Sequence, residues 1–326
     1  MSTYHRLQKF NHQTRRLCVI PAYAQDATLF PTRPIRIVIG FTPGGQPDIT
    51  ARLVGPKLAE SLGQQVVVDN RPGAGGVLGA RIVATSSADG HTLLSITSAH
   101  VVAPTVHARL GYHPLRDFAA ITQTTSAAYL LVVPPSLDVK SVKDLIALAK
   151  ARPGQINFSS GSTGSGTHFA AEMFKSAAAI DVVHIPYKGI PEALTDTVSG
   201  RVHFFMSPLA SAINLVRDGK LRALGVSSAK RVRAYADVPT IAEAALPGFE
   251  WDSWGGFLAP AKTPRAVVGK LNRESGRVLT LPEVQQRLVS LGAEPQPGTP
   301  EQFDQMLAAQ LVLYANLARR AGIKAE

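Results

Sequence analysis

Short β-branched segments alternate with helical segments along most of the chain, and glycine-rich turns join several of them. Residues 35–39 (IRIVI) have the composition of a strand, and after a turn that contains two glycines Asp48 begins a helical segment. A second unit has a strand at 66–68, a glycine turn at 72–76 and a helix over 78–83. Strands that alternate with helices predict an α/β fold built on mostly parallel sheets.

The length of 326 residues suits two domains. Two extended segments flanked by proline, at 129–133 and 248–258, are interpreted as hinge crossings between two lobes. The remaining expected helices are 142–149, 167–178, 266–279, 282–291 and 300–321, and the remaining expected strands are 92–96, 156–159, 182–185 and 221–226. Because a chain that crosses twice ends in the lobe where it began, we expect a discontinuous domain 1, residues 27–128 with 250–326, and a domain 2, residues 129–249.

Two glycine-rich turns, one in each expected lobe, lie at 43–48 and 160–167. Each follows a strand and precedes a helix, so each presents unpaired backbone N–H groups and the positive end of a helix dipole. Two such ends that face each other across a cleft form an anion site. Glycine also serves simple tight turns, but the second turn holds more hydroxyl groups than a turn requires, on Ser159, Ser160, Ser162, Thr163, Ser165 and Thr167.

Enzyme signatures are missing from these turns. No lysine separates Gly166 from Thr167, so the second turn is not a Walker A loop, and Thr163 and Thr167 flank Ser165 where a nucleophile elbow would have glycines. No G-x-G-x-x-G follows the first strand, which argues against dinucleotide binding. Cys18 is the only cysteine, so neither an internal disulfide nor a cysteine metal cluster is expected, and no cofactor is expected.

Histidines provide two candidate ligand contacts. His168 and Glu172 are four residues apart on one expected helix face, but two ligands do not make a metal site. A hydrogen-bonding histidine at a helix start is the favoured interpretation of His168. His100 follows a strand and is expected to point at the cleft edge, whereas His203 lies in a strand pattern and is interpreted as structural.

Residues 1–26 resemble a degenerate export signal, with basic residues, a short apolar stretch at 17–21 and an A-x-A arrangement that ends at Ala24. The formal net charge is +11, and subtracting the four basic residues that precede residue 25 leaves +7. These remaining charges are scattered over several expected elements, so we expect no nucleic-acid partner. No later stretch approaches the ~20 apolar residues of a membrane span.

A set of motifs, taken in their order along the chain, resembles the Bug-type receptors of tripartite tricarboxylate transporters. Each motif is weak alone, but the order is specific, and the resemblance covers residues 31–326. The motifs are PIRIV at 34–38 with PGG at 43–45 and Asp48, NRPGAGG at 70–76, DG at 89–90, HIPYKG at 184–189, ALTD at 193–196, GKLRAL at 219–224, DVPT at 237–240, and LAP at 258–260 with TP at 263–264.

The resemblance implies a two-lobed α/β periplasmic binding protein of type II, a Venus-flytrap fold with two hinge crossings. It also implies a small carboxylate ligand, held mainly by the loops that follow the first strands of each lobe. No catalytic residue is expected. Carried onto this chain, the expected ligand contacts are Phe41, Gly44, Gly45, Gln46, Asp48, Ser98, His100, Ser160, Ser162, Thr163, Thr167, His168, Tyr187, Lys188 and Ser207.

Three departures from the family pattern bear on the ligand. Gln46 stands where many relatives have a small residue, and Met206 and Ser207 stand where an aspartate often follows the strand. The loss of that acid argues against an amino-acid ligand, whose ammonium group favours a carboxylate partner. Trp254 lacks the second aromatic residue that commonly accompanies it in the family, which predicts more space in the cleft beside the hinge-side wall. These departures favour a dicarboxylate or an aromatic carboxylate.

The predicted function is a periplasmic solute-binding receptor, and not an enzyme, that captures a small carboxylate and delivers it to the membrane subunits of a tripartite tricarboxylate-type transporter. We expect a monomer. Two alternatives stay open at this point. One is a ligand sensor for a signalling system, and the other is an enzyme that acts on an anionic substrate with His168 or His100 as its base.

Overall fold

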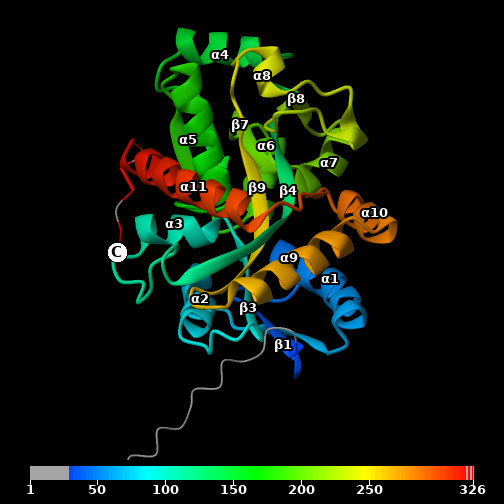
Figure 1. The fold of residues 1–326 in the computed structure, drawn as a ribbon. Helices are drawn as coiled ribbons and strands as arrows, with labels where there is room; N and C mark the ends of the chain where they lie inside the picture. The colour runs from blue at the N-terminus through cyan, green and yellow to red at the C-terminus, as the bar shows by residue number, and fades with distance from the viewer. Residues whose placement is uncertain (1–28, 321, 324, 326) are drawn as a thin grey trace, which may run out of the picture.

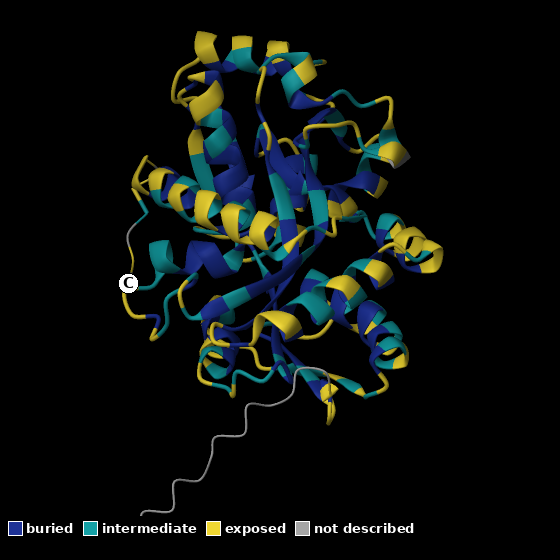
Figure 2. Cartoon of the chain, viewed as in Figure 1, coloured by how far each residue is buried: buried dark blue, intermediate teal, exposed yellow. Residues whose placement is uncertain are grey.

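The protein has two α/β lobes that share one long strand (Figure 1). The computed structural model describes residues 29–320, 322, 323 and 325. The expected leader, residues 1–26, lies outside the described residues. Buried strands run through the centre of both lobes, and the helices around them expose their outer faces (Figure 2). The predicted two-lobed α/β architecture is confirmed.

The sheet of the first lobe has the strand order β2-β1-β3-β9-β4. Strands β1 (Ile35–Ile39), β2 (Val66–Asn70) and β3 (Thr92–Thr97) are parallel to one another. Strand β9 (Asp252–Pro260) runs antiparallel to β3 on one side and to β4 (Phe118–Val133) on the other. The apolar run of β1 is almost wholly buried, as expected for a strand with neighbours on both edges and helices on its faces.

The sheet of the second lobe has the order β4-β7-β5-β6, and β8 also pairs with β4. Strands β5 (Asn157–Ser160), β6 (Val183–Pro186) and β7 (Phe204–Pro208) are parallel. Strands β7 and β8 (Arg222–Val226) run antiparallel to the final residues of β4. Each lobe therefore combines a parallel set of strands with a crossing strand that runs antiparallel to it, β9 in the first lobe and β4 in the second.

The helices connect these strands in alternation, as the sequence predicts. They are α1 (Gln46–Leu62), α2 (Val77–Ala84), α3 (Ala99–Val106), α4 (Val142–Ala151), α5 (Gly166–Ala178), α6 (Ile190–Val198), α7 (Leu209–Arg217), α8 (Ile241–Ala244), α9 (Arg265–Leu279), α10 (Pro282–Ser290) and α11 (Pro300–Arg320). The short elements η2 (Ala74–Gly76), η3 (Arg233–Tyr235) and β10 (Glu294–Pro295) complete the described fold.

Strand β4 belongs to both sheets. Its residues 118–128 pair with β9, and its residues 129–133 pair with β7 and β8. The register against β9 shifts twice, between Ala120 and Thr122 and between Gln123 and Thr125. Such irregularities bend a strand and increase its twist, so β4 turns from one lobe into the other without a break. The segment 129–133 that was expected as a crossing is thus the end of a much longer strand.

The second crossing is hydrogen-bonded to the first through Ser227. The hydroxyl of this fully buried residue accepts a hydrogen bond from the backbone N–H of Tyr129 in β4, at 2.8 Å, and donates one to the carbonyl of Trp251. The backbone of Ser227 adds two further bonds, from its N–H to the Tyr129 carbonyl and from the Trp251 N–H to its carbonyl. One side chain therefore holds both crossing segments together at the hinge.

Helix α11 contacts both lobes. It packs on α3 and β4, and the ring of Tyr314 meets Phe169 of α5 edge-on at 5.1 Å between centroids. Near its end, Arg320 donates a hydrogen bond to the hydroxyl of Ser176, also in α5, at 2.8 Å. By contrast, α9 packs on β4 and α1. The contacts of α11 therefore do not assign it to one lobe, although the sequence analysis placed all three carboxyl-terminal helices in the first. The domain boundary near residue 250 stays a prediction.

We expect the substitution Ser227→Ala to lower the free energy of unfolding by about 2 kcal/mol, because it leaves the buried Tyr129 N–H and Trp251 carbonyl without this partner. Urea unfolding of the two proteins measures the difference. The neighbouring Ser228 is the control, since its hydroxyl bonds the Lys230 carbonyl in an exposed position. Equal losses for Ser227→Ala and Ser228→Ala would show that the hinge does not depend on this hydroxyl.

Candidate ligand-binding cleft

A cleft of about 440 Å³ lies between the two lobes, next to the crossing strands. Its lining includes the first residues of three helices, namely Gly45 and Gln46 at α1, Ser98 and Ala99 at α3, and Ser165 and Gly166 at α5. The first two helices belong to the first lobe and α5 to the second. Because the first N–H groups of a helix have no acceptor within it and carry the positive end of its dipole, the cleft attracts anions from both sides.

Apart from the imidazole of His107, which follows α3, the other side chains that line the cleft are apolar or carry uncharged polar groups. Among the described residues, the cleft lining contains no lysine, arginine, aspartate or glutamate side chain. Val102, Ala103 and Val106 of α3 contribute an apolar wall, to which Phe41 and Tyr129 add aromatic surface. The site therefore offers backbone donors for charged groups and an apolar surface for the remainder of a ligand.

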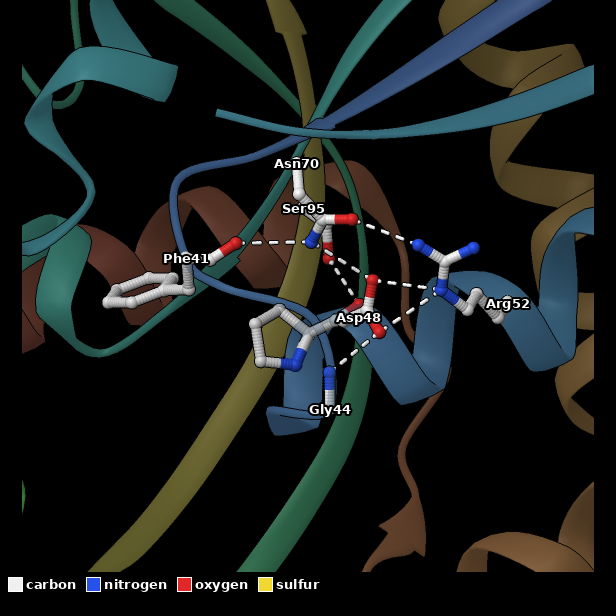
Figure 3. Close-up of polar contacts among 7 residues, drawn as sticks. Phe41, Gly44, Asp48, Arg52, Asn70 and Ser95 are labelled. Carbon is white, nitrogen blue, oxygen red and sulfur yellow. Dashed lines mark hydrogen bonds and ion pairs between the residues drawn. The ribbon is translucent and has the colours of Figure 1, made fainter. Parts of the chain in front are cut away.

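The first glycine turn is held in shape by the buried carboxylate of Asp48 (Figure 3). One oxygen accepts the Gly44 N–H at 2.9 Å, the other accepts the Asn70 side-chain amide at 3.0 Å, and both lie within 3.1 Å of Arg52 Nε. The Asn70 amide also donates to the Phe41 carbonyl at 3.1 Å. Gly44 thus points its N–H inward, while the following N–H groups of Gly45 and Gln46 have no hydrogen-bond acceptor among the described residues.

The environment of Asp48 keeps it ionised. Burial alone would raise the pKa of this carboxyl, but the hydrogen bonds from Arg52, Gly44 and Asn70 outweigh burial and hold the pKa below its ordinary value. A lowered pKa in the folded state means that the carboxylate stabilises the fold at neutral pH and loses this effect as the pH falls through the lowered value.

The second glycine turn is held from inside by side chains of α5. Thr167 Oγ1 accepts the Gly161 N–H at 2.9 Å, and His168 Nδ1 accepts the Gly164 N–H at 3.0 Å. Ser165 caps the helix by accepting the His168 N–H at 3.3 Å. These bonds use the inward-facing groups of the turn, while the Gly166 N–H at the cleft has no acceptor among the described residues.

His168 belongs to a buried cluster behind this turn. Its ring stacks on His184 at 3.8 Å between centroids, and His184 Nε2 is 2.6 Å from the hydroxyl of Ser160. Burial lowers the pKa of His168 to about 3 and that of His184 to about 4, and the nearby charge of Lys175 acts in the same direction. Both rings are therefore neutral at physiological pH, which His168 requires in order to accept the Gly164 N–H.

The lobes touch at the mouth of the cleft. Gly164 of the second turn has a φ of +75°, and a Cβ at this position would lie 2.9 Å from Cγ1 of Val106 in α3. Only glycine fits there, because the left-handed backbone and the close approach both disfavour a side chain. In this structure the second turn therefore rests against the first lobe.

The structure separates the expected contact residues into groups. Phe41, Gly45, Gln46 and Ser98 line the cleft, as the sequence analysis expects of ligand contacts. Gly44, Asp48, Ser160, Thr167 and His168 hold the two turns in shape and do not line it. Ser162 and Thr163 are exposed on the second turn. The last three lie elsewhere in the second lobe: Tyr187 donates to Asp196 at 2.8 Å, Lys188 is exposed, and Ser207 is fully buried.

His100 does not face the cleft, contrary to the sequence analysis. Its Nε2 bonds the Pro114 carbonyl at 2.8 Å, and its ring packs between Tyr112 and Phe118. Burial lowers its pKa to about 4, so it is a neutral core residue. The residue follows a strand that ends at the cleft, but it is already inside α3, whose turn rotates the side chain into the core.

Several cleft residues were missed by the sequence analysis. Tyr129 was interpreted only as part of a crossing, and Ser253 lies in the other crossing. Val102 and Val106 were not considered, although their spacing of four residues on α3 places them on one helix face. An apolar face on a helix that starts at the cleft edge is the signal that could have found them.

A larger hollow of about 710 Å³ lies between the lobes and is lined by Asp252. Because Ser253 lines the cleft and successive strand residues point to opposite faces, the hollow is on the other side of β9 from the cleft. Long charged side chains of both signs surround it, including Lys230, Arg233 and Glu294. We place the ligand in the smaller cleft, because helix N-termini of both lobes converge there. Within the part of the chain that the structure describes, no group of three metal-ligating side chains is present.

The two α/β lobes face each other across a cleft without lysine, arginine, aspartate or glutamate side chains, and helix N-termini of both lobes converge on it. This arrangement defines a solute-binding protein of the periplasmic type. A family model described as "Tripartite tricarboxylate transporter family receptor" matches residues 50–323. Protein BugT of Bordetella pertussis is 34% identical over 323 residues, which cover 96% of this chain and 99% of BugT. The chain belongs to this receptor family, whose members are solute-binding proteins and not enzymes. The family predicted from the ordered motifs is therefore confirmed.

Solved structures of relatives agree with this assignment. R. palustris Rpa4515 with adipate is 36% identical with a TM-score of 0.76, covering 91% of this chain and 100% of that one. MatC from Rhodopseudomonas palustris with bound malate is 30% identical with a TM-score of 0.71, covering 89% of this chain and 100% of MatC. No helix in the described ranges is both long and apolar enough to cross a membrane.

Replacing Asp48 with asparagine should lower the free energy of unfolding by about 2–4 kcal/mol, because Arg52 and the Gly44 N–H lose a charged, buried acceptor. Denaturant unfolding at neutral pH measures the loss. Asp218→Asn is the matched control, since Asp218 pairs with Lys220 at 3.5 Å where both side chains are more than half exposed. A loss for Asp48→Asn no larger than that for Asp218→Asn would contradict the role of this carboxylate.

Acidification from pH 7 to pH 5 should lower the stability of the protein by about 4 kcal/mol. His100, His168 and His184 have lowered pKa values in the folded state, so the unfolded chain binds more protons between pH 6.5 and 4 and gains stability as the pH falls. Burial raises the pKa of Asp252 to about 6, which acts in the opposite direction and offsets part of the loss. Unfolding free energies at several pH values test the sign.

The substitution His168→Asn separates this titration from the hydrogen bond to the turn, because the asparagine oxygen can accept the Gly164 N–H without titrating. The variant should depend less steeply on pH than the original protein over pH 6.5 to 4. A steeper or unchanged dependence would show that His168 does not contribute to it.

Proposed function

We propose that this chain is an extracytoplasmic receptor that captures a linear dicarboxylate with an apolar backbone and presents it to the membrane subunits of a tripartite tricarboxylate-type transporter. The observation that supports this proposal most is the convergence of α1, α3 and α5 N-termini from both lobes on a cleft without charged side chains. The same observation favours a receptor over a catalyst, because the described cleft lining offers no carboxylate, no metal cage and no activated nucleophile beside its one imidazole, His107.

The geometry suits a ligand with an anionic group at each end. One carboxylate can accept the free N–H groups of Gly45 and Gln46 on the first lobe, and the other can accept the Gly166 N–H on the second. Hydrogen bonds of this type to a charged group contribute about 1.5–3 kcal/mol each. The segment between the two carboxylates would lie against Val102 and Val106 of α3.

The relatives support an acid of this class. Adipate, bound by the relative that is 36% identical, has an unsubstituted chain between its carboxylates. Malate, bound by the relative that is 30% identical, carries a hydroxyl group and a shorter chain. The apolar face of α3 suits the first type of ligand, because the methylene chain of adipate can bury apolar surface against Val102 and Val106.

Ligand capture in this proposal is a domain closure. Residues 27–128 with 250–326 would move against residues 129–249, and β4 and the Ser227 bonds would act as the hinge. A dicarboxylate that contacts both lobes stabilises only the closed form, so its binding shifts the population towards that form. Membrane subunits would recognise the closed arrangement. The proposed location is the periplasm, with residues 1–26 as the export signal.

Adipate should bind to the purified protein and change its tryptophan emission, because Trp251 and Trp254 are buried beside the crossing segments that closure bends. The substitution Gly164→Ala should weaken adipate binding at least about tenfold, since a Cβ would press on Val106 and hold the lobes apart. Titration by emission and by calorimetry measures both effects.

The control for this variant is Gly219→Ala. Gly219 also has a left-handed backbone, with a φ of +69°, but no atom lies within 4 Å of its added Cβ. It therefore reproduces the backbone strain without touching the other lobe, and adipate affinity should be retained. An absence of saturable binding with any linear dicarboxylate from four to eight carbons would refute the proposed ligand class.

A further inference from the structure

The two lobes also approach each other closely on the face of the crossing strands that lies away from the cleft. Gly292, which follows α10, faces Ala210 near the start of α7 (Figure 1). A Cβ at Gly292 would lie 3.1 Å from the Cβ of Ala210 and 3.4 Å from its backbone nitrogen. Both residues line the larger hollow of about 710 Å³. We call this pair of residues the rear contact.

The rear contact joins elements of different lobes. Helix α10 packs on α1 and α9, and its buried residue Leu288 lies in the same apolar cluster as Ile37 of β1. Helix α7 packs on β7 and β4, and its first residue, Leu209, lies in the same apolar cluster as Phe205 of β7. In the proposed closure the glycine of the rear contact therefore moves with the first lobe, and the alanine moves with the second.

The hollow and the cleft lie on opposite faces of the crossing strands. In β9, Asp252 lines the hollow and Ser253 lines the cleft, and in β4, Ala128 lines the hollow and Tyr129 lines the cleft. Each of the two spaces has walls in both lobes. A rotation of the lobes about these strands therefore widens one space as it narrows the other. Opening the cleft brings the two residues of the rear contact closer together, and closing the cleft moves them apart.

Small residues leave room at the rear contact for the cleft to open. The backbone alone requires a glycine at 292, because its φ of +75° ends α10 with hydrogen bonds from the Gly292 N–H to the Val289 carbonyl and from the Ala293 N–H to the Leu288 carbonyl. Ala210 has no such requirement, since it is an exposed residue inside α7, where the backbone accepts larger side chains. A longer side chain there would start from a Cβ that already faces Gly292, in the space into which the first lobe moves as the cleft opens.

We propose that the rear contact is a stop that limits opening of the cleft, and that added volume at this contact raises the affinity for a dicarboxylate by disfavouring the open form. The inference rests on the proposed function, since it names what limits the movement opposite to ligand-induced closure. Added volume should therefore have opposite effects on the two faces, weakening binding at Gly164 and strengthening it at Ala210. A ligand that binds only the closed form gains affinity by the factor by which the population of that form rises.

The experiment replaces Ala210 with phenylalanine in the full chain and measures adipate binding by calorimetry. Ala210→Phe should bind adipate at least about fivefold more tightly than the original protein, because overpacking between the lobes disfavours the open form. Without adipate, the variant should also be more compact, with a smaller radius of gyration in small-angle X-ray scattering. A variant that only lost stability would not bind more tightly.

Ser211→Phe is the matched control. Ser211 is the next residue of α7 and is exposed, but it does not line the hollow. This variant adds the same ring to the same helix, and both its adipate affinity and its radius of gyration should equal those of the original protein. Gly292→Ala adds volume from the first lobe and should also strengthen binding, with Gly219→Ala as its control for the left-handed backbone.

Adipate binding by Ala210→Phe that is no tighter than binding by Ser211→Phe would overturn the inference and leave the proposed function intact. If the original protein binds no linear dicarboxylate, the proposed ligand class fails, and scattering from the two ligand-free variants then tests the stop by itself. In that case a smaller radius for Ala210→Phe than for Ser211→Phe would support the stop, and equal radii would overturn it.

Discussion

Both lobes depend on one strand, β4, because it belongs to the sheet of each lobe. In the first sheet β4 pairs with β9, and in the second it lies between β7 and β8. Because the backbone groups of each half are committed to a different sheet, β4 ties the two lobes together, and it is the axis about which the proposed closure would rotate them. Ser227 adds the second attachment by bonding β4 to the returning chain. The cleft lies beside this axis, so a small rotation about β4 changes the distance between its two walls.

A cleft without charged side chains has consequences for how an anion is captured. A lysine or arginine on one lobe would hold a carboxylate strongly even in the open form, because a single charge attracts it without help from the other lobe. Neutral N–H donors at a helix start offer each carboxylate less, and water competes with them while the lobes are apart. Both sets of donors act together only after closure has excluded water. In the proposed closure the ligand would therefore favour the closed form over the open one, which is the differential affinity that a reporting conformational change requires.

The order of elements and the two glycine turns could be predicted from the sequence, because strand composition, glycine and helix starts are local signals. The roles of the hydroxyl groups could not, whereas the sequence did indicate His168 as a hydrogen-bonding histidine at a helix start. Thr167, His168 and Ser160 were expected to contact the ligand, but they satisfy the inward-facing groups of the second turn. A tight turn has N–H groups on both of its faces, and the sequence does not show which face a neighbouring side chain will serve. His100 was misplaced for a related reason, since one residue of helix rotation separates the cleft from the core.

The crossing residues show the limit of local signals most clearly. Tyr129 and Ser253 are more than a hundred positions apart in the chain, and each reads as an ordinary residue of an extended segment. They meet only because β4 and β9 pair along the hinge, with Ala127 opposite Ser253 and Ala128 opposite Asp252. That register also places Asp252 on the far side of the sheet and Ser253 in the cleft, where the Ser253 hydroxyl donates a hydrogen bond to Gln46 Oε1. A shift of one residue would exchange the two side chains and place a carboxylate in the path of an anionic ligand. The pairing of the hinge strands therefore sets the chemistry of the cleft as well as the motion of the lobes.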